Sequence, residues 1–225
     1  MTLPALLRAA TVACLGLVAA GEAAAQVKLA TNYGITVARI PIGTDTASAE
    51  FTDKDYSITM SGRASGLLRI LASGEGTLST VGIFKDGKPT PTRYVSTTTA
   101  DDDKLDVTIT FEDGNVKDMK VSDPPPVPDR VPLADAHRKG VLDPLTAMFI
   151  PGTDTGDGLG QAECRRTLPI FDGRRRYDIV LTYKRAEKVK ADKGYAGPAV
   201  VCSAVLKPIA GHRTSSSLLK FVDGR

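Results

Sequence analysis

Hydrophobic and polar residues alternate with a period of two along much of the chain, and this pattern predicts half-buried β-strands. The clearest case is 104–111, where every second residue from Leu105 to Phe111 is apolar. Asp113-Gly114 follows and is a favoured two-residue turn, so we predict a hairpin that returns through 116–121. Other expected extended segments are 27–37, 56–60, 77–84, 93–99 and 200–206, whereas 43–49 is predicted as a polar turn region and 67–71 fits a strand or a helical turn equally well.

Two further turns are predicted from Asp-Gly pairs, Asp86-Gly87 and Asp172-Gly173, because glycine tolerates the positive φ that such turns demand. The second turn lies in a hairpin predicted over 164–183. After this turn, apolar and polar residues alternate, which predicts one core face and one solvated face. The expected core face carries Tyr177, Ile179, Leu181 and Tyr183. The following lysine-rich stretch, 186–198, is expected to be a charged excursion between strands.

One short helix is predicted after residue 142. Asp143 is a favoured N-cap, Pro144 suits the first helical position, and apolar residues follow as far as Ile150. Four prolines within 124–128 remove backbone donors, so this segment is expected to be a stiff crossing rather than a strand. The expected fold class is mainly β: a curved antiparallel sheet or open barrel with one short packed helix.

Residues 1–25 have the features of a cleaved secretory signal: Arg8 near the start, an apolar run over 9–20, and Ala23-Ala24-Ala25 before the expected cleavage site. We therefore expect export to the periplasm. The apolar run is shorter than the ~20 residues of a membrane span, and no later stretch is suited to cross a bilayer. The mature protein is expected to be soluble.

Two cysteines, Cys164 and Cys202, are left after Cys14 is removed with the signal. In an exported protein an isolated pair is most simply a disulfide. The alternative, a redox-active or metal-binding pair, lacks a Cys-x-x-Cys spacing and a nearby histidine cluster. We therefore predict a Cys164–Cys202 bridge.

The mature chain, 26–225, is expected to be a single β-rich domain, because about 200 residues can bury one sizeable core. Its formal net charge of +3 is too near neutral to predict nucleic-acid binding. Asp223-Gly224 is a turn signal with no returning strand after it, which leaves open that the domain lacks its last strand or two.

Motifs that carry catalysis are absent from the sequence. The two histidines, His137 and His212, lie in no Gly-x-Ser-x-Gly elbow and no His-x-x-x-His metal motif. We expect a protein that is not an enzyme and that uses no cofactor and no metal. The glycine-rich segment 151–160 lacks both a phosphate-loop lysine and EF-hand spacing, so calcium at Asp154 and Asp157 is only an alternative.

Two motifs resemble those of a known family. They are the run from Val141 to Ala147, with Asp-Pro-Leu-Thr-Ala at its end, and the run from Pro169 to Asp178, with Cys164 between them. Together they resemble the bacterial domain-of-unknown-function family 3108, in its exported proteobacterial branch, over about 33–213. The resemblance implies an envelope protein with a curved β-sheet, similar in outline to periplasmic lipoprotein carriers. It implies no catalytic mechanism.

The densest positive cluster lies around the 172–173 turn. Arg165, Arg166 and the run Arg174, Arg175, Arg176 would lie on paired strands and suit a phosphate, a sulfated sugar or a lipid headgroup. The candidate ligand-binding residues are Arg174, Arg175, Arg176 and Tyr177. The alternative is that the arginines pair with Glu163, Asp172 and Asp178 and protect a sheet edge.

A sheet that curves around the predicted helix would also offer an apolar groove for an acyl chain. Its expected lining is Tyr33, Ile35, Val107, Ile109, Tyr177 and Ile179. The alternative is an ordinary dry core. The first functional hypothesis is non-enzymatic binding of a hydrophobic or lipid-like ligand, with the arginines near its headgroup. The second is a structural or assembly factor of the envelope that acts through protein contacts.

Overall fold

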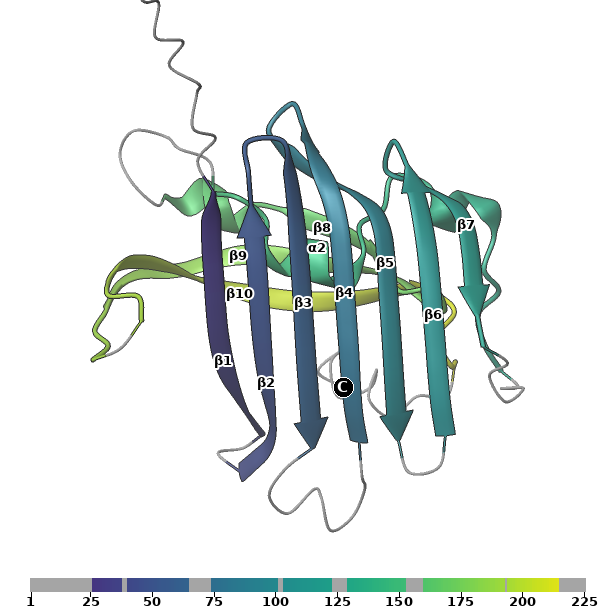
Figure 1. Ribbon diagram of the computed structural model, residues 1–225, viewed down its shortest axis with the longest axis horizontal. Helices are drawn as coiled ribbons and strands as arrows, with labels where there is room; N and C mark the ends of the chain where they lie inside the picture. The colour runs from purple at the N-terminus through teal and green to yellow at the C-terminus, as the bar shows by residue number, and fades with distance from the viewer. Residues whose placement is uncertain are drawn as a thin grey trace, which may run out of the picture.

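The structure is a computed structural model that describes residues 26–37, 40–64, 74–100, 103–122, 129–152, 160–192 and 194–214. These residues form two antiparallel sheets and short helices, which confirms the mainly β prediction (Figure 1). Several predictions lie outside the described residues: the signal at 1–25, the ambiguous 67–71, the prolines of 124–128, the acidic loop with Asp154 and Asp157, and the end of the chain from 215.

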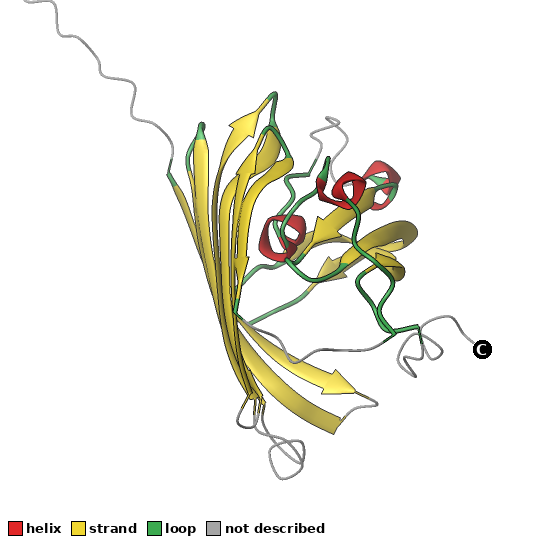
Figure 2. Cartoon of the chain, turned by 90° about the vertical axis from the view of Figure 1, so that its right-hand side faces the viewer, coloured by secondary structure: helices red, strands yellow, loops and turns green. Residues whose placement is uncertain are grey.

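The larger sheet has seven strands within the described residues, and their spatial order is their order in the chain. They are β1 (Val27–Val37), β2 (Ile40–Phe51), β3 (Asp55–Ala64), β4 (Gly74–Lys85), β5 (Lys88–Ala100), β6 (Asp103–Glu112) and β7 (Asn115–Val121). β1 and β7 form the two edges, so the sheet is open. Figure 2 shows that it curves around the rest of the protein.

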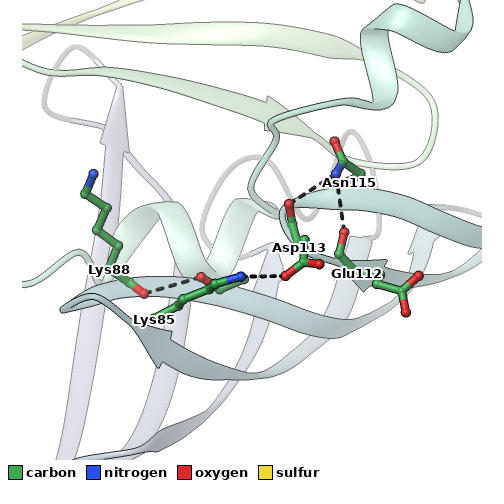
Figure 3. Close-up of polar contacts among 6 residues, drawn as sticks. Lys85, Lys88, Glu112, Asp113 and Asn115 are labelled. Carbon is green, nitrogen blue, oxygen red and sulfur yellow. Dashed lines mark hydrogen bonds and ion pairs between the residues drawn. The ribbon is translucent and has the colours of Figure 1, made fainter.

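The two predicted turns in this sheet are confirmed. Asp86 and Gly87 have φ of 51° and 70°, and Asp113 and Gly114 have φ of 50° and 75°, as a tight two-residue hairpin turn requires. The turns lie side by side, and the Nζ of Lys85 is 2.8 Å from Oδ1 of Asp113 (Figure 3). This ion pair joins the β4–β5 hairpin to the β6–β7 hairpin.

The prediction of a polar turn over 43–49 is wrong, because these residues lie in β2. Ala47 and Ala49 are buried, whereas Thr44, Thr46 and Ser48 face the other way and are exposed. The inward positions from Gly43 to Ala49 carry glycine, aspartate and alanine instead of large apolar residues. The period of two was therefore present but weak.

The smaller sheet has three described strands in the order β10-β9-β8: β8 (Thr167–Phe171), β9 (Arg176–Val189) and β10 (Gly197–Ala210). Figure 1 shows its strands running across those of the larger sheet. The predicted excursion over 186–198 is wrong in part, because β9 extends to Val189, where it pairs with Gly197. Glu187 and Lys188 are successive residues of β9 and point to opposite faces, so this part of the strand shows no alternation of apolar and polar residues.

The β8–β9 hairpin is confirmed, but its turn lies one residue later than predicted. The backbone N–H of Asp172 donates to the carbonyl of Arg175 at 3.2 Å, so Gly173 and Arg174 are the central residues. Gly173 has φ of 92°, and a Cβ there would lie 2.6 Å from Cγ1 of Val107. Glycine thus serves both the turn and its close approach to the larger sheet.

The core lies between the concave face of the larger sheet and a layer formed by β8 and α2 (Pro144–Met148). α2 contacts β3, β4, β5 and β8, which confirms the prediction of a short packed helix. Asp143 is its N-cap, as predicted, although the helix ends at Met148. Leu145, Phe171 and Ile109 have no exposed surface.

The predicted disulfide is confirmed. Cys164, at the end of the short helix η2 (Gln161–Cys164), is bonded to Cys202 on β10, with 5.4 Å between the Cα atoms. A third short helix, η1 (Asp135–Arg138), precedes α2. In the described part of the chain, no helix has both the length and the apolar character needed to span a membrane.

Candidate ligand-binding groove

Three cross-strand rows on the concave face define the site, because each strand places every second residue there. The first row is Ala49, Ile58, Thr80, Tyr94 and Ile109, and the second is Ala47, Met60, Leu78, Ser96 and Val107. Most side chains in these two covered rows are buried. The next row is Asp45, Gly62, Gly76, Thr98 and Leu105, which we call the glycine row. All five of its residues are half-buried.

A cavity of about 380 Å³ lies where the β8–β9 turn meets the concave face, and we call it the turn cavity. Side chains of both layers enclose it. The larger sheet contributes Leu78, Tyr94, Ser96, Thr98, Leu105 and Val107, and the opposite side contributes Arg130, Pro144, Asp172, Arg174, Arg175 and Tyr177. The turn cavity therefore combines an apolar and hydroxyl-bearing wall with a basic wall.

A second hollow of about 400 Å³ lies further along the same face, and we call it the glycine groove. It shares Leu78 and Thr98 with the turn cavity, so the two hollows adjoin. Its floor includes Gly43, Gly62, Ala64, Gly74 and Gly76, and Ile35, Ile42 and Met60 also line it. A Cβ at Gly74 would have one neighbour within 4 Å, so space is left above the sheet there. Above Gly62 the space is occupied by the carboxylate of Asp45, which also lines the groove.

The predicted ligand residues divide into two groups. Arg174, Arg175 and Tyr177 line the turn cavity. Arg176 does not line it, because its Nη1 lies 2.6 Å from Oδ1 of Asp178 in a largely buried ion pair. The face of β9 that carries this pair is consequently less solvated than predicted.

The alternative of local pairing is confirmed for several arginines. Besides the Arg176–Asp178 pair, Arg166 pairs with Glu163, and the Nε of Arg175 lies 2.9 Å from Oδ2 of Asp172. Arg165 donates to the side chain of Gln161. The five arginines therefore form no single cluster, and two of them reach the turn cavity.

The predicted apolar lining is also divided. Val107 and Tyr177 line the turn cavity, and Ile35 lines the glycine groove. Ile109 belongs to the dry core, as the alternative held. Tyr33 is exposed on β1, and Ile179 is half-buried on β9.

Arg130 is a cavity residue that the sequence did not reveal. It forms an isolated bridge with Arg213, and its Nη1 donates to the carbonyl of Gly211 at 2.6 Å. Gly211 in turn lies against the carbonyl of Arg174, which leaves no room for a Cβ. No local signal marked Arg130, because pairing between segments 80 residues apart places it there.

The electrostatics of the basic wall are unbalanced. Burial lowers the pKa of Arg130, and the neighbouring Arg174, Arg175 and Arg213 lower it further, while Asp172 opposes them. The Asp172 carboxylate is already engaged: its Oδ1 accepts the backbone N–H groups of Arg174 and Arg175, at 2.9 and 2.7 Å. Burial raises the pKa of Tyr177 to about 12, so its hydroxyl stays protonated at neutral pH.

A buried polar network fixes the layer that closes the covered rows. Oδ1 of Asp143 accepts the backbone N–H groups of Leu145 and Thr146, and Oδ2 accepts the hydroxyls of Thr146 and Thr80 at 2.5 and 2.9 Å. The Tyr56 hydroxyl lies 2.9 Å from that of Thr146. Because Asp143 has no exposed surface, it positions Pro144 at the cavity and does not itself contact a ligand.

The histidines lie outside both hollows. Nδ1 of His137 accepts the backbone N–H of Ala134 at 3.0 Å and so closes a local turn. His212 lies in the segment that pairs with Val131. Among the described residues, no group of three or more histidine, cysteine, aspartate or glutamate side chains is placed to hold a metal ion.

Comparison with known proteins yields one match. The family model described as "Protein of unknown function (DUF3108)" matches residues 30–216. This range includes every residue that lines the turn cavity and the glycine groove. No curated protein and no solved structure matches the chain.

Proposed function

The chain belongs to the DUF3108 family, and from its concave face we propose that the protein is a non-enzymatic, exported envelope protein that binds a hydrophobic or lipid-like ligand. The observation that carries this proposal is that the turn cavity and the glycine groove adjoin on the concave face, where Leu78 and Thr98 line both. Each hollow is within the range of small-molecule sites, roughly 300–1,000 Å³.

The dimensions of the paired hollows suit an extended chain. From Leu105 on β6 to Ile35 on β1 the lining crosses five strand spacings, which is about 24 Å at ~4.8 Å per strand. The groove part of this path is lined by apolar side chains and glycines, together with Thr98 and the carboxylate of Asp45. An acyl chain would gain about 25 cal/mol for each Å² of apolar surface removed from water.

Exposed apolar side chains extend the path beyond the hollows. Leu29, Tyr33 and Ile35 project from the concave side of β1, where they pair with inward residues of β2, and all three are exposed. A continuous exposed apolar surface of this kind is typical of binding sites in soluble proteins. These residues provide a surface on which the far end of a long ligand can lie.

Export is supported by the Cys164–Cys202 disulfide and by the leader-like residues 1–25. Disulfides persist in oxidising compartments such as the periplasm. Exposing an acyl chain to the aqueous periplasm is unfavourable, so a protein that shields the chain from water would lower the free energy of transferring it.

The proposal is tested by native mass spectrometry and lipid extraction of protein purified from the periplasm, followed by titration with a fluorescent fatty acid. We expect a co-purified lipid and saturable binding of the probe. Gly74→Leu should reduce probe affinity about tenfold, because the new side chain enters the glycine groove where an ideal Cβ has only one neighbour within 4 Å, at 3.7 Å.

Gly34→Leu is the matched control. Gly34 pairs with Thr44 on the opposite face of the sheet, and a Cβ there has no neighbour within 4 Å. This variant should bind the probe as the parent does. An empty purified protein that binds no probe would contradict the proposal.

A second function, assembly of envelope components through protein contacts, is favoured by the outer edge of β1, which pairs with no other strand in the described part of the chain. An exposed strand edge can pair with a strand of another protein. If the protein acts by assembly, Gly74→Leu should leave the envelope of the source cell intact. Ala30→Lys should disturb it, because Ala30 is exposed on β1, pairs with Ser48 and faces away from the ligand path. The opposite result favours ligand binding.

A further inference from the structure

We propose that the turn cavity holds an anionic, phosphate-type head of the ligand, so that the ligand class is an anionic amphiphile such as an alkyl phosphate or a phospholipid. This inference rests on the proposed function and specifies the chemistry of one end of the same site. Four arguments support it, from charge, free donors, hydroxyl groups and the position of the apolar path.

The first argument is the excess of positive charge. Arg174, Arg175 and Arg213 all lie close enough to act electrostatically on Arg130, and Asp172 is the carboxylate that opposes them there. Like charges held together at a partly buried site repel one another, and the low local dielectric strengthens that repulsion. A bound anion would remove it.

The second argument is the state of the individual donors. Asp172 is used by the turn, where it accepts two backbone N–H groups and the Nε of Arg175. The Arg174 guanidinium lines the cavity and is half-buried, yet within the described chain it has no hydrogen-bond or ion-pair partner. Its planar fork therefore remains available for two oxygens of one phosphate group.

The third argument is the presence of neutral donors beside the guanidinium. The Tyr177 hydroxyl lines the cavity and is protonated at neutral pH, and burial raises its pKa further, to about 12. On the opposite wall the Ser96 hydroxyl is hydrogen-bonded to that of Tyr94, and both residues line the cavity. Phosphate offers more acceptor oxygens than a carboxylate does, and a wall with several kinds of donor suits it better.

The fourth argument is the position of the basic wall relative to the apolar path. Leu105 and Val107 lie within the turn cavity, and Leu78 connects it to the glycine groove. A head held by Arg174 would thus direct an attached chain toward the glycine groove. A free phosphate ion would use the donors alone and leave this path empty.

The test compares decyl phosphate, decanol and inorganic phosphate as competitors of a fluorescent alkyl probe, at fixed pH and ionic strength. Decyl phosphate should bind about 10–100 times more tightly than decanol, as expected for hydrogen bonds to a charged group. Arg174→Gln should remove most of this difference without changing the affinity for decanol. Arg174→Lys, which keeps the charge but loses the fork, should give an intermediate affinity.

Arg185→Gln is the matched control, because Arg185 is exposed on β9, pairs with Glu187 and lines neither hollow. It should leave all three affinities unchanged. Circular dichroism and thermal unfolding establish that each variant folds. Arg130 is less suitable for this test, since its bond to the carbonyl of Gly211 also holds two segments together.

The outcomes separate the two proposals. Binding of neither alkyl competitor contradicts the proposed function itself. Equal binding of decanol and decyl phosphate, unaffected by Arg174→Gln, overturns the anionic head and leaves hydrophobic binding in place. Inorganic phosphate that competes as strongly as decyl phosphate also overturns the inference, because the site would then recognise a free ion.

Discussion

The two ends of the concave face are built on the same strands, yet one is a core and the other is a groove. Under α2 and β8, the rows carry large residues such as Tyr94 and Ile109, which are 2% and 0% exposed. Along the glycine row, Gly62 and Gly76 occupy the equivalent inward positions. Strand alternation alone therefore does not decide which end closes. Side-chain size and the position of the second layer decide it.

The second layer is held in place by polar contacts as well as by apolar burial. Asp143 joins α2 to the larger sheet through Thr80, at a point surrounded by buried residues. Such a network is specific in position, because a small displacement of α2 would leave a buried carboxylate without donors. The glycine groove has no equivalent contact among the described residues, and most of its lining is half-buried.

The largest effect is expected when the same substitution is made at both ends. Leu145→Ala should lower the free energy of unfolding by about 2–5 kcal/mol, because Leu145 is fully buried and its removal leaves a cavity. Leu105→Ala should cost roughly 1 kcal/mol, since Leu105 lies in the glycine row and is half-buried. Urea denaturation measures both. Equal losses would show that the two ends are packed alike.

The next largest effect is expected from removing the disulfide between Cys164 in η2 and Cys202 in β10. Replacing Cys164 and Cys202 together by alanine should lower the free energy of unfolding by roughly 3–4 kcal/mol, because the bonded residues are 38 positions apart and the unfolded chain gains freedom. Probe binding should persist in whatever fraction remains folded, since neither cysteine lines a hollow. A change below about 1 kcal/mol would contradict this expectation.

Features set by neighbours in the sequence were predictable. The turns at Asp86-Gly87 and Asp113-Gly114, and the Asp143 cap with Pro144 after it, depend on local backbone chemistry and were confirmed. β2 was missed because its inward positions from Gly43 to Ala49 carry glycine, aspartate and alanine and no large apolar residue. The small residues that hid this strand are the same kind that form the floor of the glycine groove.

The candidate site was only partly predictable, because some of its residues are brought together by contacts between distant segments. Arg174, Arg175 and Tyr177 were identified from a local concentration of charge, and they line the turn cavity. Arg130 reaches it through pairing with 211–214, which no local pattern reports. Arg176 does not line the turn cavity, because it forms an ion pair with Asp178, two residues away.

A smaller effect is expected in the pH dependence of the covered end. Burial raises the pKa of Asp143, so the folded protein holds this proton more tightly than the unfolded chain does. The contribution of Asp143 to stability is then greatest below its unfolded pKa of about 4 and is lost as the pH rises toward the folded pKa. Denaturation of the parent and of Asp143→Asn between pH 4 and 8 measures it.

The stability of the parent relative to Asp143→Asn should therefore fall as the pH rises. A difference that is constant across this range, or that grows with pH, would show that the hydrogen bonds from Thr146, Thr80 and Leu145 outweigh burial and keep the carboxylate charged. In that case Asp143 would hold α2 against the larger sheet as an ionised N-cap.

The smallest effect is expected at Asp113, in the exposed β6–β7 turn. The pKa of Asp113 is lowered, whereas that of Asp143 is raised. The hydrogen bond and charge of Lys85 lower the pKa of Asp113, so its contribution to stability is present above its unfolded pKa and is lost as the pH falls. Both side chains are well exposed, and exposed pairs contribute little. Lys85→Gln should thus raise the pKa of Asp113, measured by NMR titration, without a detectable change in the free energy of unfolding. A clear loss of stability would mean that the hairpin turns, and not only α2 beneath them, hold the covered end closed.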